Sequence, residues 1–503
     1  MGGLSRRGLL GAVMAGGVAA GGPARGDPIG RARQAERDEV TIAWPCDVPG
    51  WDPGRRLLAD AQPLYKMVFD QPLERDARLG LEAGLAEAWE LAPDGRSLEL
   101  VLRDGVAFHD GVPVTSADLR WSFLERFREG PGADAGRAWR QVTAIETPDA
   151  RRAVMRFAGP SPGAPAWLAH LGGFVVARHA MGRAVGTGPF RLVEHHAGVR
   201  LVLERNEAWW GPRPALRRVV VEVMPEAAAR VAAVQAGRVD LAAGLPVREV
   251  ARLGAVPGLE TELSSLSRLV LLLVRDDGGF ADRNVRLAAH HAIDKAALVQ
   301  AFAHGVAVPL SLAAAPGSAG FDDDFLFPHD PNLAILLLEK AGHSLARPAR
   351  VRLAATRGLF AGDYDMARAI VAMWRRVGIE AVLEVVDAAR QMELARAGRL
   401  PEAALWSFDG GAEPETGLGA LLDPELPFAP EADAVLARQA GVLAGVADAA
   451  ARAEGWQALG RAAVEAGACL PLLQGVQALV RRQALSHRAY GNGWVLPQTM
   501  AWL

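Results

Sequence analysis

The chain has 503 residues, of which 50% are hydrophobic and 22% charged, an ordinary composition for a soluble globular protein of several domains. Its formal net charge of −3 argues against a general nucleic-acid binder or a membrane-surface binder. The 2 cysteines, Cys46 and Cys469, are too few and too far apart for a disulfide framework or a zinc site. One bridge between them and two separate thiols are both compatible with the sequence.

The first residues have the pattern of an export signal. Arg6 and Arg7 form a twin arginine, and the apolar run over 9–20 that follows is shorter than the roughly 20 residues of a membrane span. We therefore predict a twin-arginine-type signal and leader over 1–38, the alternative being a disordered tail. No cysteine ends the apolar run, so no lipid anchor is expected.

Strands and turns dominate the part that follows the leader. Leu98, Leu100 and Leu102 alternate with Glu99, Val101 and Arg103, which indicates a half-buried strand. Thr115 stands three residues before Asp118, the spacing of a capping box at the start of a helix. The patterns predict strands over 39–47, 85–91 and 98–102, a helix over 64–73, and a hairpin over 142–157.

The middle of the chain contains a long apolar strand. The run 266–274, LSRLVLLLV, reads as a buried strand that crosses into a second lobe. Before it, the patterns predict a strand-turn-strand unit after 186–190 (GTGPF), a strand over 216–224 and a helix over 227–236.

The second half alternates strands and helices, which is typical of a parallel sheet. A strand over 351–356, a helix over 365–377 and a strand over 379–386 form a βαβ unit, and a short strand over 403–407 follows. His290 and His291 are adjacent on a predicted helix and point in different directions, so solvated or capped histidines are favoured over a metal pair. Helices are expected over 434–466, and strands over 469–474 and 477–480.

The order of these pieces resembles the peptide/nickel-type (family 5) extracytoplasmic solute-binding proteins of ABC importers. The resemblance is carried by LAEAWE, PDG and LRDGVAFHDG with the helix after Thr115, by GTGPF, and by VRLAAHHAIDK over 285–295. It implies an α/β, two-lobed periplasmic-binding-protein fold of type II, the Venus-flytrap fold, with an extra subdomain in the first lobe. The implied divisions are lobe 1 over 39–265 with the extra subdomain at about 51–185, lobe 2 over 266–476, and a return to lobe 1 over 477–503.

Two charged residues follow strands of the predicted parallel sheet. Arg357 follows the strand over 351–356 and Asp409 follows the strand over 403–407, and ligands of open α/β sheets bind at such ends. In peptide-binding members that the chain resembles, the residue matching Asp409 pairs with the ligand's amino group and the one matching Arg357 with its carboxylate. A carboxylate and a bidentate guanidinium suit a zwitterionic ligand. Trp406 is a candidate apolar wall or a core residue, and Trp44 is a weaker candidate.

The resemblance implies a receptor that captures a short peptide or amino-acid-derived solute between hinged lobes and delivers it to membrane permease subunits. The run after Asp409 lacks the family's usual aromatic residue and Asp-Pro pair, so a receptor for a nickel chelate or another non-peptide solute is the alternative. A secreted hydrolase is a third possibility without a supporting motif, since no P-loop, H-E-x-x-H or G-x-S-x-G is present. We expect a periplasmic monomer without a cofactor, resident metal or nucleic-acid partner, and not an enzyme.

Overall fold

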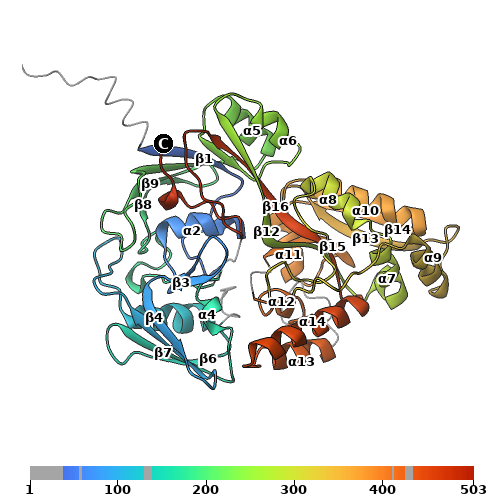
Figure 1. Cartoon of the computed structure of the whole chain (residues 1–503), viewed down its shortest axis with the longest axis horizontal. Coiled ribbons are helices and arrows are strands. Elements are labelled where there is room, and N and C mark those ends of the chain that lie inside the picture. The colour runs from blue at the N-terminus through green and yellow to red at the C-terminus, as the bar shows by residue number, and fades with distance from the viewer. Residues whose placement is uncertain (1–37, 56–58, 130–138, 171, 410–412, 425–433) are drawn as a thin grey trace, which may run out of the picture.

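The computed structural model describes residues 38–55, 59–129, 139–170, 172–409, 413–424 and 434–503. The predicted signal and leader lie outside the described residues except for Asp38. Figure 1 shows two lobes side by side, joined by strands β12 and β16. We call residues 38–258 with 483–503 the first lobe and residues 275–468 the second lobe; β12 and β16 belong to both.

One sheet of ten strands runs through both lobes, in the order β14-β13-β15-β12-β16-β11-β1-β10-β9-β8. Its strands are β1 Glu39–Trp44, β8 Phe190–His196, β9 Arg200–Arg205, β10 Arg218–Val223, β11 Leu241–Ala243, β12 Leu259–Val274, β13 Ala349–Thr356, β14 Ile379–Val386, β15 Ala403–Asp409 and β16 Cys469–Arg482. The parallel pairing of β13 with β14, and of β13 with β15, confirms the predicted βαβ arrangement.

Strands β12 and β16 pair antiparallel over most of their length and carry the chain between the lobes. Their register shifts between Ser265 and Leu269, where a bulge interrupts the ladder. The sequence predicted the apolar half of β12 and missed the polar half, 259–265, which lies on the side of the first lobe. The two short strands predicted over 469–474 and 477–480 are one continuous strand, β16.

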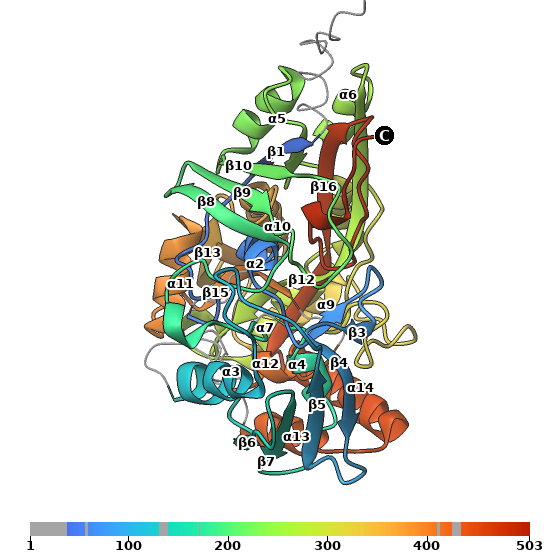
Figure 2. The ribbon, with the colours of Figure 1, turned by 90° about the vertical axis from the view of Figure 1, so that its left-hand side faces the viewer.

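A smaller sheet lies at the far end of the first lobe from α5 and α6 (Figure 2). Its order is β4-β5-β7-β6, and a two-stranded sheet pairs β2 with β3. The strands are β2 Leu73–Arg75, β3 Leu81–Ala83, β4 Ala86–Leu91, β5 Ser97–Leu102, β6 Val142–Glu146 and β7 Arg152–Phe157. This part corresponds to the subdomain expected from the resemblance; its boundaries stay a prediction.

Helices cover both lobes. They are α2 Gln62–Val68, α3 Ser116–Arg120, α4 Ala164–Trp167, α5 Ala227–Gln235, α6 Glu249–Gly254, α7 Arg283–His291, α8 Lys295–Ala303, α9 Pro331–Lys340, α10 Asp363–Val377, α11 Ala388–Arg396, α12 Leu418–Leu421, α13 Ala434–Leu443 and α14 Ala449–Glu465, with a π-helical turn η2 Trp121–Arg128 and the short 3-10 turns η1 Ala59–Ala61, η4 Arg178–Ala180, η5 Gly278–Phe280 and η6 Pro497–Thr499. The predicted capping box before α3 is confirmed, since the Thr115 amide donates to Asp118 Oδ2 at 2.8 Å.

The helix predicted over 64–73 is shorter than expected. α2 ends at Val68, and the chain turns at Asp70 before β2 begins at Leu73. Pro72 disfavours helical geometry in the residue before it. The buried Asp70 carboxylate accepts hydrogen bonds from Trp209 Nε1 at 3.2 Å and Trp210 Nε1 at 2.7 Å, which fixes this turn.

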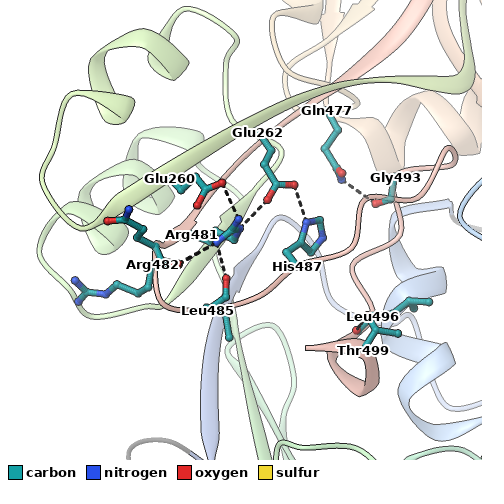
Figure 3. Close-up of polar contacts among 11 residues, drawn as sticks. Glu260, Glu262, Gln477, Arg481, Arg482, Leu485, His487, Gly493, Leu496 and Thr499 are labelled. Atoms are coloured by element: carbon teal, nitrogen blue, oxygen red, sulfur yellow. Dashed lines mark hydrogen bonds and ion pairs between the residues drawn. The ribbon is translucent and has the colours of Figure 1, made fainter. Parts of the chain in front are cut away.

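The C-terminal segment is fastened to the paired strands by a network of ion pairs (Figure 3). Arg481 on β16 contacts Glu260 at 2.8 Å and Glu262 at 2.7 Å on β12. His487 Nδ1 lies 2.7 Å from the second oxygen of Glu262, and Arg481 also donates to the backbone oxygen of Leu485 at 2.5 Å. Ion pairs and hydrogen bonds therefore connect the first-lobe end of the two crossing strands to the segment that follows them.

Candidate functional site

The carboxyl ends of β13 and β15 lie at the same edge of the second lobe's sheet. Leu353 pairs with Ala403 and Ala354 with Ala404 in parallel register. Arg357 follows β13, and Asp409 is the last residue of β15. Their positions at strand ends agree with the sequence analysis, and this edge is where open α/β sheets bind ligands. Their role as ligand contacts stays a prediction.

Arg357 lies over an aromatic ring on the next helix. Its Cζ is 3.8 Å from the centroid of the Tyr364 ring, a cation–π contact. The turn beneath it is held by Asp363, whose Oδ2 accepts from Thr356 Oγ1 at 2.7 Å and from the Leu359 amide at 2.8 Å. The Arg357 side chain is exposed, so water weakens any ion pair it forms there.

Asp409 lies among cationic side chains from both lobes. Ser267 Oγ is 3.4 Å from its Oδ1. Arg75 of the first lobe and Arg268 of β12 both interact electrostatically with the Asp409 carboxylate. An ammonium group of a ligand would therefore reach a carboxylate that already has guanidinium neighbours.

Arg75 connects the first lobe to the second. Its Nη2 lies 3.7 Å from Oε1 of Glu413, and its side chain is only 9% exposed. Burial lowers the pKa of the Arg75 guanidinium, and Glu413 and Asp409 oppose that change. Its Nη1 donates to the backbone oxygen of Leu79 at 2.7 Å, which positions the side chain within the β2–β3 turn.

His170 lies near Asp409 and Arg75. Burial lowers the pKa of His170, the nearby Asp409 raises it, and Arg75 lowers it further. Its buried Nε2 has no hydrogen-bond partner in the part of the chain that the structure describes. The ring is therefore a neutral polar group with an unused nitrogen next to two charged side chains.

Arg268 interrupts the apolar run of β12. Its Nη2 is 2.9 Å from Asp60 Oδ1. Burial lowers the pKa of Arg268, but Asp60 and Asp409 raise it above its ordinary value, so the guanidinium stays charged. Trp44, which is 4% exposed, donates its Nε1 to the backbone oxygen of Asp60 at 2.7 Å and thus supports this pair from the first-lobe core.

The two cysteines are separate thiols. Burial, with Asp60, raises the pKa of Cys46, and burial raises the pKa of Cys469 to about 12. Both thiols are uncharged at neutral pH. The disulfide that the sequence left possible is absent between these two described residues.

Trp406 packs in a hydrophobic core of the second lobe. It is 4% exposed and belongs to a cluster with Leu271, Leu418 and Trp456. From the sequence, Trp406 was either an apolar wall of the site or a core residue, and its burial favours the core. Its role in ligand binding stays a prediction.

Several polar or charged residues of this region were not predicted from the sequence: Asp60, Arg75, His170, Arg268 and Glu413. Arg268 carried a visible signal, since it is a charged residue in an otherwise apolar predicted strand. Arg75 and Glu413 carried none, because their proximity depends on how the lobes meet.

No group of three or more His, Cys, Asp or Glu side chains in the described ranges is arranged to hold a metal ion. Solvated or capped histidines were expected, and the solvated alternative is wrong because His290 and His291 are both buried. Their rings stack on Phe327 with centroid distances of 3.7 and 4.4 Å. His291 Nδ1 donates to the backbone oxygen of Pro328 at 3.0 Å. Both rings therefore contact one phenylalanine, although they are adjacent on the helix.

Known proteins share both the sequence and the fold. Residues 80–425 match the family of bacterial extracellular solute-binding proteins, family 5. This chain belongs to that family. The nickel-binding periplasmic protein of Escherichia coli (strain K12) is 27% identical over 382 residues, which are 69% of this chain and 71% of that protein. The dipeptide-binding protein of the same strain is 25% identical over 395 residues, 71% and 73% of the two chains.

Solved structures of binding proteins have the same fold as this family 5 member. The periplasmic binding protein DppA from Helicobacter pylori, in complex with the peptide STSA, has a TM-score of 0.84 at 20% identity, covering 94% of this chain and 99% of that one. NikA from Staphylococcus aureus, in complex with Ni(L-His)2, has a TM-score of 0.82 at 16% identity, covering 93% and 100%. The predicted two-lobed type II fold is confirmed. Among the described residues, no helix combines the length and apolar character needed to cross a membrane.

Proposed function

We propose that this solute-binding protein is the extracytoplasmic receptor of an ABC importer for a short peptide or similar amino-acid-derived solute. It acts as a binding protein rather than an enzyme, in the periplasm, as a monomer that delivers its ligand to membrane permease subunits. Export by the twin-arginine route without a lipid anchor is part of the same proposal. The ligand-binding residues would be Asp409 and Arg357, with Trp406 and Trp44 behind them.

The observation that carries this proposal is the placement of Asp409 and Arg357 at adjacent strand ends of the second lobe. A carboxylate and a guanidinium held at one edge of a sheet suit the amino and carboxylate groups of a zwitterion. The relatives named for dipeptides support that ligand class. Hinged lobes release and capture such a ligand without bond chemistry.

The relatives named for nickel support a second candidate, a metal chelate. A chelate brings most of its own metal ligands, so the protein would need charged groups for the chelator rather than a cluster of metal-binding side chains. Arg75, Arg268 and Arg357 are suitable for the carboxylates of a chelator.

Isothermal titration calorimetry with L-alanyl-L-alanine, and in parallel with Ni²⁺ and L-histidine together, tests the two candidates. For the peptide, Asp409→Asn and Arg357→Gln should each weaken binding at least about tenfold, since each removes one charge partner of the ligand.

Arg350 and Glu380 form an exposed ion pair near the amino end of β13, with 3.3 Å between Nε and Oε2. Arg350→Gln is therefore the matched control, and it should bind the peptide like the unaltered protein. Unchanged affinity in both site variants would refute the assignment of Asp409 and Arg357. Stoichiometric binding of the nickel–histidine mixture without peptide binding would favour the chelate.

A further inference from the structure

The two residues assigned above to the ligand's charged groups both belong to the second lobe. A ligand held only by Asp409 and Arg357 would have the same contacts whether the lobes are apart or together. Such a ligand cannot shift the balance between the two states, because a shift requires a difference in affinity between them. A residue of the first lobe must contact the ligand for binding to bring the lobes together.

Arg75 has the position and charge for this contact. It is in β2 of the first lobe, and its guanidinium points to Glu413 and interacts electrostatically with Asp409, both in the second lobe. The distance of 3.7 Å to Glu413 exceeds the 2.7–2.9 Å typical of a charge-assisted hydrogen bond. The pair is therefore loosely formed, and a ligand group that approaches more closely can replace it.

The backbone around Arg75 holds it in place. Arg75 pairs with Leu81 across the β2–β3 ladder, and its Nη1 is bonded to the Leu79 carbonyl. The preceding residue, Glu74, forms a buried ion pair with Lys66. A guanidinium fixed in this way loses less conformational freedom on binding than a mobile surface arginine.

Two ion pairs lie between the lobes, beside the further carboxylate of Asp409. Arg268 is matched by Asp60, and Arg75 by Glu413. A ligand that separates Arg75 from Glu413 must therefore offer an anionic group to the first and a cationic group to the second, or leave both charges unpaired. A zwitterion satisfies both, whereas a ligand with one charge does not.

We infer that Arg75 is a specificity-determining contact for the ligand's carboxylate, and that Glu413 receives its ammonium group together with Asp409. This inference rests on the proposed function and deepens it. The ligand then has charged contacts in both lobes, so that binding a zwitterion draws the lobes together. Arg75 thus adds a contact from the first lobe to the carboxylate that Arg357 binds from the second.

The test measures the affinity for L-alanyl-L-alanine and for L-alanyl-L-alanine amide, which lacks the carboxylate. The unaltered protein should prefer the acid by at least about tenfold. Arg75→Gln should lose that preference through weaker acid binding, with amide binding changed less than about twofold. Retained amide binding also shows that the variant is folded. Arg151→Gln, in an exposed pair with Glu87, is the control within the first lobe and should keep the preference.

The outcomes separate the inference from the proposed function. If the unaltered protein binds the acid and Arg75→Gln keeps its preference over the amide, the inference is wrong and the peptide receptor stands. Equal losses of acid and amide binding in Arg75→Gln would also refute it, because they indicate a structural role. If the unaltered protein binds neither probe, the proposed peptide function fails and the inference with it.

Discussion

His109 and Gly188 connect two of the sequence motifs that identify the family. His109 Nε2 donates to the Gly188 carbonyl oxygen at 3.0 Å, and Nδ1 lies 3.4 Å from the Gly186 amide nitrogen, which donates to it. One ring nitrogen acts as a donor and the other as an acceptor, which is the pattern of a neutral imidazole. The two motifs therefore form one structural unit of the first lobe and are separate from the charged residues between the lobes.

Gly188→Ala should destabilise the protein severely. A Cβ at this position would lie 2.6 Å from the carbonyl carbon and 2.8 Å from the carbonyl oxygen of Val68, both backbone atoms that cannot move aside. We expect a loss of about 2–4 kcal/mol in the free energy of unfolding, measured by urea denaturation. Gly159→Ala, where no atom lies within 4 Å of the new Cβ, should change it by less than about 0.5 kcal/mol.

The stability of the protein should fall as the pH decreases from 6.5 to about 4. Burial lowers the pKa of His109 to about 4, so the folded protein resists a proton that the unfolded chain accepts. The stabilisation is complete above pH 6.5 and disappears as the pH falls through 4, up to roughly 3 kcal/mol. His109→Gln should flatten this part of the stability profile. An equal slope in His109→Gln and in His196→Gln, whose side chain is 61% exposed, would contradict the assignment.

Lys295 should make the free energy of unfolding depend on pH on the alkaline side as well. Its buried Nζ donates to the Leu310 carbonyl oxygen at 2.7 Å, and burial lowers its pKa to about 7. The folded state thus binds fewer protons than the unfolded state between pH 7 and 10.5. The free energy of unfolding should rise with pH in that range, by at most about 1.4 kcal/mol per pH unit from this group. Lys295→Met should remove the rise, and Lys340→Met, at the exposed end of α9, should retain it.

Glu262 should contribute more to stability than its neighbour Glu260. Burial would raise the pKa of Glu262, but hydrogen bonds from His487 and Arg481 lower it below its ordinary value. Glu262→Gln should cost about 2–3 kcal/mol, since it leaves the buried His487 without its carboxylate partner and Arg481 with the exposed Glu260 alone. Hydrogen exchange should then accelerate over residues 485–499. Glu260 is 47% exposed, and Glu260→Gln should cost less than about 1 kcal/mol. Similar effects of both substitutions would show that the network does not hold the segment.

Local patterns predicted most of the secondary structure. The alternation at Leu98, Leu100 and Leu102 and the Thr115–Asp118 spacing depend on neighbours in the chain, and both are confirmed in β5 and before α3. The polar half of β12 was missed because its strand geometry comes from pairing with β16, which lies far along the sequence. The end of α2 was missed because it depends on buried contacts of Asp70 with Trp209 and Trp210.

The candidate site was predictable only in part, for the same reason. Strand order placed Arg357 and Asp409 at one edge of the second lobe's sheet. The sequence contains no pattern that brings Arg75 to Glu413, since that distance depends on how two separately folded cores meet. Arg268 was visible as a charge within an apolar strand, but only the structure shows its partner, Asp60.

The first lobe is completed by the last part of the chain. β16 pairs with β11 and β12, and Trp502 Nε1 donates to the backbone oxygen of Glu39 at 2.9 Å, at the start of β1. During synthesis, the edges of β11 and of the first half of β12 that pair with β16 therefore stay unpaired until some two hundred further residues have been made. Unpaired edges favour aggregation, and contacts between distant segments form slowly. Co-translational folding of this protein cannot finish its N-terminal lobe first, so the growing chain should depend on chaperones until its C-terminal strand has emerged from the ribosome.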